Sequence, residues 1–193
     1  MIIDISQEVL SCKVWPGNPA PQAQRLKSLA QGGSSNLSAF SMCAHNGTHA
    51  DAPYHFVENG KTIGQLPLET FVGDCFVARH EGDVTADDAG LILHKAKQSG
   101  ADKRILIAGK ATVTAEAAQV FAAAGLWLIG NESQTVGPEN APKQVHLILL
   151  GAGVALLEGL VLERVEEGKY FLSAAPLNLG GCEGAPCRAV LVR

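Results

Sequence analysis

The residues with the clearest chemical potential lie in one short run near the start of the chain. Residues 45–55 read HNGTHADAPYH and hold three of the six histidines, His45, His49 and His55, together with Asp51. Imidazole and carboxylate ligands together suit zinc, manganese or iron better than calcium or magnesium. Taken singly, each histidine is more often an ordinary polar group, but four such groups interleaved with glycine and proline indicate a metal site.

The spacing of these groups requires a turn. In a flat strand His45 and His49 would lie about 13 Å apart, at roughly 3.3 Å per residue, which is too far to share an ion with bonds of about 2 Å. Gly47 permits the unusual dihedrals of a turn, and Pro53 stiffens the exit from it. We therefore expect His45, His49 and Asp51 to converge. A metalloprotease helix of the HExxH type is excluded, because asparagine follows the first histidine.

The same run resembles the signature of a known family. Its pattern H-x-G-T-H-x-D-x-P-x-H is similar to that of the cyclase family of metal-dependent hydrolases, which includes bacterial kynurenine formamidase and isatin hydrolase. Residues 14–19, VWPGNP, resemble the family's Trp-Pro-Gly-Asp segment. Residues 176–181 and 184–188 resemble its glycine-rich C-terminal strand pair. The similarity therefore extends over nearly the whole chain.

The resemblance implies a set of metal ligands. His45, His49 and Asp51 would bind a first divalent metal, Zn or Mn. Asp51 would bridge to a second ion completed by His146 and Glu158, which gives one or two ions per subunit. Without the resemblance, a histidine in an apolar run and a glutamate in an apolar strand are explained equally well as structural groups.

The resemblance also implies which groups act on the substrate. His55 would be the catalytic acid or base, and Trp15 would line the pocket and stack on an aromatic substrate. Asn18 stands where the family has aspartate, and Asn131 with Glu132 departs from the family's Gly-Ile-Asp-x-Ser run. We expect these departures to shape the pocket. Glu132 could be an acid of the pocket, although a solvated loop glutamate is the simpler interpretation.

The expected chemistry is hydrolysis of a C–N amide bond. A bound dication lowers the pKa of its water from about 15.7 to about 7 and polarises a carbonyl, while His55 would pass a proton to the leaving nitrogen. The leading substrate is an aryl formamide such as N-formylkynurenine, which would give kynurenine and formate. Hydrolysis of a cyclic amide or lactone, as by isatin hydrolase, and non-catalytic binding of a metal or small molecule are the alternatives. A GxSxG elbow for serine catalysis is absent.

Length and composition favour one globular domain over residues 1–193, with 47% hydrophobic residues and a net charge of −4. The scattered Lys and Arg residues form no basic stripe, so we expect a small-molecule substrate and no nucleic acid. No apolar run reaches the ~20 residues of a membrane span, and we expect a cytoplasmic protein without membrane contact. The five cysteines lack a CxxC pair, which favours reduced thiols.

The elements that must position these groups follow from apolar patterning and caps. Three helices are expected, at residues 85–98, 114–125 and 142–151, although the last apolar run would also suit a buried strand. Strands are expected at residues 2–5, 37–43, 71–79, 104–108, 126–129, 154–157, 170–174 and 188–192. Trp127 is expected in the core. The order indicates an α/β domain with a partly parallel sheet, and the resemblance implies the family's swivelling β/β/α fold with a mixed sheet, assembled as a homodimer or homotetramer.

Overall fold

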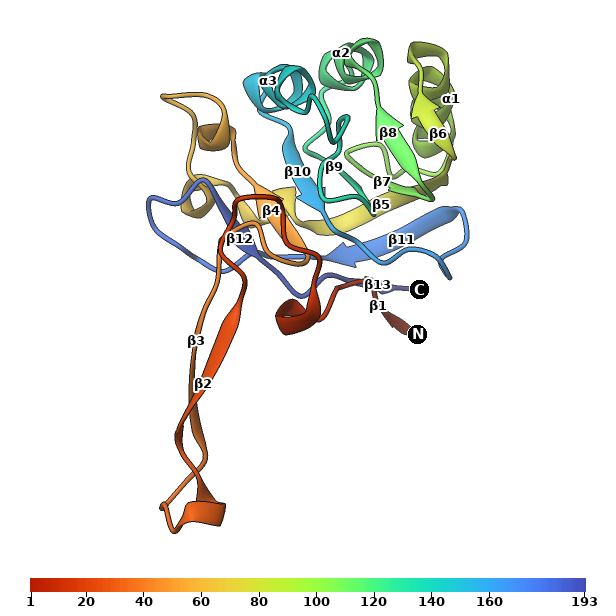
Figure 1. Ribbon diagram of the computed structural model, residues 1–193. Coiled ribbons are helices and arrows are strands. Elements are labelled where there is room, and N and C mark those ends of the chain that lie inside the picture. The colour runs from red at the N-terminus through yellow and green to blue at the C-terminus, as the bar shows by residue number, and fades with distance from the viewer.

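A curled, nine-stranded mixed sheet forms the centre of the computed structural model, which describes residues 1–193 (Figure 1). Its four central strands, in the order β5, β7, β9 and β10, run parallel to one another. The strands on either side of them pair antiparallel. Across the sheet the strands are β1 (Ile2–Asp4), β13 (Val190–Val192), β11 (Gly168–Ser173), β5 (Val72–Arg79), β7 (Arg104–Ala108), β9 (Leu128–Asn131), β10 (Ala155–Glu158), β4 (His49–Asp51) and β12 (Gly184–Pro186).

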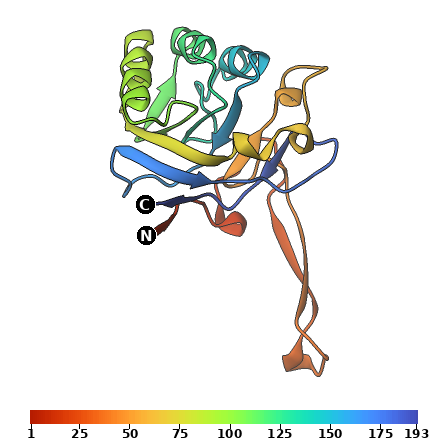
Figure 2. The ribbon, with the colours of Figure 1, turned by 180° about the vertical axis from the view of Figure 1, so that it is seen from behind.

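Three helices cover one face of this sheet and lie side by side in both views (Figures 1 and 2). They are α1 (Ala86–Gln98), α2 (Ala115–Ala123) and α3 (Lys143–Gly151). The Thr85 hydroxyl caps α1 by accepting the Asp88 N–H, and the Asp88 carboxylate accepts the Thr85 N–H in return. Parallel strands require such crossovers, so the helices are the connections between β5, β7, β9 and β10.

Both faces of the parallel strands are buried. In β7, Ile105 and Ile107 pack under the helices, whereas Leu106 faces the second core on the other side of the sheet. A strand buried on both faces reads as a continuous apolar run instead of an alternating one. This is why the sequence pattern identified β7 and its neighbours.

A ribbon of two strands, β2 (Gln22–Lys27) and β3 (Leu37–Ser41), projects away from the body of the molecule (Figures 1 and 2). Every residue of both strands is exposed. A short parallel pair, β6 (Gly82–Val84) with β8 (Ala111–Val113), lies beside the helices. Short 3-10 helices are η1 (Val9–Ser11), η2 (Leu29–Gln31), η3 (Pro53–His55), η4 (Ile63–Gln65) and η5 (Leu68–Thr70). None of the helices has the length and apolar character needed to span a membrane.

The mixed α/β architecture and the three helices expected from the sequence are confirmed. The eight predicted strands are present, β7 with the predicted ends and the others with shifted ends. Five further strands, β2, β4, β6, β8 and β12, were not predicted. The prediction for Trp127 is wrong: this side chain is 42% exposed, just before β9. One face of its indole lies against the guanidinium of Arg104, 5.1 Å from the ring centroid, so a cation–π contact holds it at the end of the sheet.

Candidate metal centre

Strand β4 presents two candidate ligands on one face. His49 and Asp51 are two residues apart and point to the same side of the strand, while Ala50 points into the core on the other side. The antiparallel register with β10 places Glu158 directly opposite His49. Because paired residues project to the same face of a sheet, the three polar side chains meet there. All three are buried, with His49 3% and Glu158 2% exposed.

The turn before β4 brings His45 to the same place. Gly47 has a φ of +66°, a conformation that glycine adopts without steric cost. Thr48 fixes the turn, because its hydroxyl donates a hydrogen bond of 2.5 Å to the Gly159 carbonyl. As a result, Nδ1 of His45 lies 2.9 Å from Oδ1 of Asp51.

Helix α3 supplies His146. The apolar residues Val145 and Leu149 pack the helix onto the sheet, and the intervening turn directs His146 toward β10 and β4. Its Nε2 lies 3.4 Å from Oε1 of Glu158 and 3.7 Å from Oδ2 of Asp51. The structure therefore brings the histidine of an apolar helix and the glutamate of an apolar strand to the same centre as the histidine-rich run.

Three histidines share one arrangement: one ring nitrogen is held by an oxygen outside the centre, and the other faces the carboxylates. The outer contacts are His45 Nε2 to Glu183 Oε1 at 3.1 Å, His49 Nδ1 to the Gly47 carbonyl at 2.9 Å, and His146 Nδ1 to the Pro142 carbonyl at 2.9 Å. Such outer hydrogen bonds fix the tautomer and orientation of metal-binding histidines. The inward nitrogens are therefore positioned as ligands.

The carboxylate of Asp51 is the shared member of two groups of ligand atoms, in each of which all atoms lie within 4.8 Å of one another. Asp51 is fully buried, and neither of its oxygens has a well-aligned hydrogen-bond donor. A buried carboxylate ordinarily has such partners, and this donor set is one that Zn or Mn accepts. The residues therefore fit divalent cations. The first group is His45, His49 and Asp51, and the second group is Asp51, His146 and Glu158.

Electrostatics at the centre favour ionised carboxylates. Burial alone would lower the pKa of His45, but its close polar contact with Asp51 and the charges of Asp51 and Glu183 raise that pKa to about 9. Burial alone would raise the pKa of Asp51, yet the close contact with His45 and the charge of that imidazole hold the pKa well below its usual range. The pKa of Glu158 is likewise lowered by His146 and His49 despite burial, so the carboxylates of Asp51 and Glu158 are both ionised at neutral pH and attract cations.

His55 differs from the other three histidines. It ends η3, its ring stacks on that of His45 with centroids 4.3 Å apart, and its Nε2 is 4.0 Å from Oδ2 of Asp51. Its side chain is 28% exposed and has no outer hydrogen bond. Burial lowers its pKa, so a neutral imidazole with free nitrogens faces the cavity at neutral pH.

A cavity of about 250 Å³ opens onto these side chains. Trp15 and Phe56 give it aromatic walls, and Asn18, Gln134 and Thr135 give it polar ones. The half-buried Trp15 comes from the segment before the ribbon, far from His55 in sequence. The cavity therefore combines a cluster of candidate ligands with a flat, apolar surface for a ring.

Comparison with known proteins decides the family. The family model described as "Putative cyclase" matches residues 3–138. The kynurenine formamidase of Paracidovorax citrulli (strain AAC00-1) is 33% identical over 99% of this chain and 96% of its own length. That of Salinibacter ruber (strain DSM 13855 / M31) is 32% identical over 98% and 96%. The chain belongs to the cyclase family. It is a metal-dependent hydrolase of that family.

Solved structures agree with the fold of this cyclase-family hydrolase. A predicted metal-dependent hydrolase from Bacillus stearothermophilus superposes with a TM-score of 0.82, 29% identity, and coverage of 99% of this chain and 97% of that one. Isatin hydrolase A from Labrenzia aggregata gives a TM-score of 0.81 with coverage of 99% and 93%. At 20% identity the second likeness concerns the fold alone.

Two of the departures from the cyclase-family pattern do not reach the cavity, contrary to expectation. Asn131 is buried and its amide donates to the carbonyls of Ala111 and Thr135. Glu132 is neither a pocket acid nor a merely solvated loop residue, because its carboxylate accepts the backbone N–H groups of Gly109 and Leu162. Both side chains therefore form hydrogen bonds with backbone groups near the ends of the parallel strands. Asn18 does line the cavity, as expected.

Sequence reasoning missed Glu183, the outer partner of His45 in this cyclase-family site. Glu183 precedes β12, a strand too short to show a pattern, which pairs with β4. The adjacent Gly184 leaves room for the imidazole, since a Cβ there would lie 2.9 Å from Cε1 of His45. The only sequence signal was the glycine-rich segment itself.

Proposed function

We propose that this hydrolase cleaves the amide bond of an aryl formamide such as N-formylkynurenine and binds one or two Zn or Mn ions per subunit. The observation that carries the proposal is the arrangement of His45, His49 and His146, each held on its outer nitrogen and turned inward to Asp51 and Glu158. Relatives about one-third identical over the full chain are named kynurenine formamidase, which supports this substrate class.

In this proposal each side chain has a separate task. His45, His49, Asp51, His146 and Glu158 would hold the metal. A bound dication supplies an acidified water and polarises the substrate carbonyl. The buried carboxylates supply the negative charge that a cation requires, and the outer hydrogen bonds keep the imidazoles in the ligand tautomer.

His55 is the proposed catalytic acid and base. Because its pKa is lowered by burial, the imidazole is neutral and can accept a proton, then pass it to the leaving nitrogen. The ring lies on the cavity side of η3 and within 4.0 Å of Asp51, so a proton taken up by His55 is stabilised by that carboxylate. Trp15 would stack on the aryl ring and orient the formamide carbonyl toward the centre.

A substrate panel tests the reaction. Metal-loaded protein is assayed on N-formylkynurenine, formanilide and isatin, each with and without a chelator. We expect chelator-sensitive release of formate from the two formamides. Preferred turnover of isatin would shift the assignment to cyclic amides, and no chelator-sensitive turnover of any substrate would leave a metal-binding protein without this activity. His94→Ala, on the exposed face of α1, controls for removal of a histidine outside the site.

We also propose that the chain assembles as a homodimer or homotetramer. An isolated two-stranded ribbon is marginally stable in water, yet β2 and β3 project from the body with Phe40 69% and Leu26 51% exposed. A second subunit would bury these side chains. Light scattering should give at least a dimer, and Phe40→Ser should weaken it, whereas Leu91→Ser on α1 should not. A monomeric wild-type protein at micromolar concentration would contradict the proposal.

A cytoplasmic location is the third part of the proposal. All five cysteines are unpaired, and burial raises the pKa of the Cys75 and Cys187 thiols to about 12. Five unpaired thiols, two of them resistant to ionisation, fit a reducing compartment. Cell fractionation checks this, and recovery of the protein in a periplasmic or secreted fraction would refute it.

A further inference from the structure

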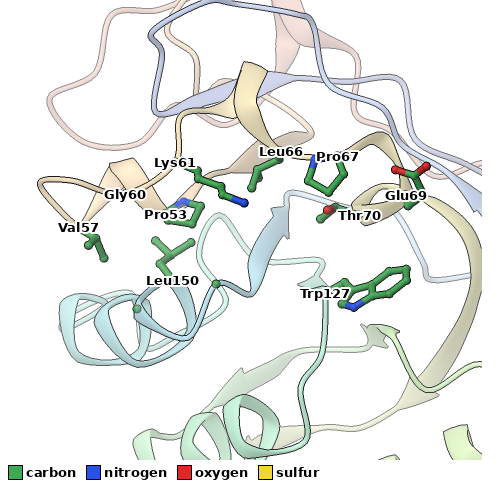
Figure 3. Close-up of a pocket in the computed structure, with 12 residues that line it drawn as sticks. Pro53, Val57, Gly60, Lys61, Leu66, Pro67, Glu69, Thr70, Trp127 and Leu150 are labelled. Carbon is green, nitrogen blue, oxygen red and sulfur yellow. The ribbon is translucent and has the colours of Figure 1, made fainter.

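A second cavity has a volume of about 400 Å³ (Figure 3). Two elements that line it also line the metal pocket. The lining of the second cavity includes the apolar residues Pro53, Leu66 and Leu150, together with Lys61 and Trp127. None of these residues takes part in the metal centre. The cavity is therefore not explained by the hydrolytic site.

The first shared wall is the loop of residues 53–61, which we call the dividing loop. Pro53 and Lys61 face the second cavity, whereas His55 faces the metal pocket. The loop is closed on itself, because the Tyr54 N–H donates to the Lys61 carbonyl at 3.0 Å and the His55 N–H donates to the Ala52 carbonyl at 2.9 Å. The backbone of Lys61 is thus joined to Tyr54, the residue directly before His55.

Helix α3 is the second shared wall. His146 lines the metal pocket, and Leu150, one turn further along the same helix, lines the second cavity. A molecule in the second cavity would therefore contact two elements that carry side chains of the metal pocket.

The charges of the second cavity define the kind of molecule it fits. Lys61 has no carboxylate within 4.0 Å and no hydrogen-bond partner for its ammonium, unlike Lys13, Lys95 and Lys169, which form ion pairs. Figure 3 shows the Lys61 side chain directed into the space between Leu66 and Leu150. Lys61 is exposed and its ammonium has no counter-charge, so an anionic group that enters the cavity can pair with it.

Trp127 supplies a fixed aromatic surface at the other end of the cavity (Figure 3). Its indole is 42% exposed and rests on the guanidinium of Arg104. That guanidinium is itself immobilised, because it donates hydrogen bonds to the backbone carbonyls of Glu69, Thr70, Val72 and Asp74. A preorganised indole binds a flat apolar group with little loss of side-chain entropy.

We propose that the second cavity binds a small aromatic carboxylate, with its carboxylate on Lys61 and its ring against Trp127, and that occupancy alters the metal pocket through the dividing loop. Glu69 lies at the Trp127 end, which disfavours the reversed orientation. The site is distinct from the substrate pocket, and the inference holds whichever amide the enzyme hydrolyses.

The two tryptophans of the chain allow a direct test, since Trp15 lines the metal pocket and Trp127 the second cavity. Metal-loaded Trp15→Phe protein reports only on Trp127, and metal-loaded Trp127→Phe protein reports only on Trp15. The probe is 3-phenylpropionate, with neutral 3-phenylpropanamide as its matched control. We expect a saturable change of Trp127 emission with the carboxylate and a much weaker one with the amide. Absence of a saturable Trp127 response overturns the proposal.

Charge removal separates the second cavity from the metal pocket. Lys61→Gln in the Trp15→Phe background should raise the apparent Kd about tenfold, the loss expected for one charge-assisted hydrogen bond. Lys97→Gln, on the exposed face of α1, should leave it unchanged. In Trp127→Phe protein the probe should also change Trp15 emission, and Lys61→Gln should move the midpoint of that change to an about tenfold higher probe concentration. A Trp15 response whose midpoint is unchanged by Lys61→Gln would mean that the probe binds the metal pocket directly and that no signal crosses the dividing loop.

Discussion

Replacing Asp51 by asparagine should remove the stabilisation of the fold by metal. Asp51 belongs to both groups of candidate ligands and is fully buried. Asparagine has nearly the same shape, and the backbone pairing of β4 with β10 and β12 does not involve the side chain. The variant should therefore fold, but it should lack the anionic oxygen that the two groups share.

The size of the effect follows from the length of the chain and from mass action. With roughly 2.1 cal/mol/K per residue, unfolding 193 residues has an entropy of about 0.4 kcal/mol/K. A ligand at a thousandfold excess over its Kd stabilises the native state by about 4.1 kcal/mol. Dividing the second figure by the first gives a rise in Tm of about 10 °C for wild-type protein on metal loading. For Asp51→Asn we expect a rise close to zero.

The assay is calorimetry or dye-based melting of each protein with excess Zn or Mn, and again with a chelator. Asp83→Asn, at an exposed position in β6, serves as the matched control and should keep the full metal-dependent rise. If Asp51→Asn retained the wild-type rise, the metal would bind elsewhere and the reasoning about the centre would be wrong. If the chelated variant were already unfolded, asparagine at position 51 would be incompatible with the fold. The metal content of the wild-type protein, measured by mass spectrometry, would then decide whether the protein binds a metal.

Three further predictions concern the same centre. The pKa of His45 is raised from about 6.5 to about 9, so its contribution to metal-free stability is complete below pH 6.5 and is lost as pH rises toward 9; Tm of chelated protein should fall over this interval, and a flat profile would contradict it. His55→Ala should lower kcat by about 10²-fold or more with unchanged metal content; loss of the metal instead would make His55 a ligand. Glu183→Gln should weaken metal binding about 10–100-fold, as expected for an outer partner of a ligating histidine; competition with a chromogenic chelator measures this, and unchanged affinity would exclude that role.

The sequence was most informative where the ligands are close together along the chain. Gly47 between two histidines required a turn, and the structure contains it, with His45 beside Asp51. The position of Glu158 opposite His49 depends on the register of β10 against β4. Register between distant strands is not visible in a single sequence, so only the family resemblance could connect Glu158 with the histidine run.

The features that sequence reasoning missed have related causes. Strands β4 and β12 have three residues each, too few to show alternation, and Glu183 is brought to His45 by their pairing. Trp127 lies in an apolar run that suggests a core residue, but it precedes the paired part of β9 and remains half exposed over Arg104. Burial at the end of a strand depends on what covers that end, and the local sequence does not specify it.

The buried charges link folding, protons and metal in one centre. Asp51 and Glu158 lie inside the protein, where an uncompensated carboxylate costs several kcal/mol. In metal-free protein, protons on the imidazoles balance the charge of the carboxylates, since the nearby carboxylates raise the pKa values of His45, His49 and His146 despite burial. A divalent cation replaces those protons, so metal binding must release them. Metal affinity should therefore rise with pH over the same interval in which the metal-free fold becomes less stable.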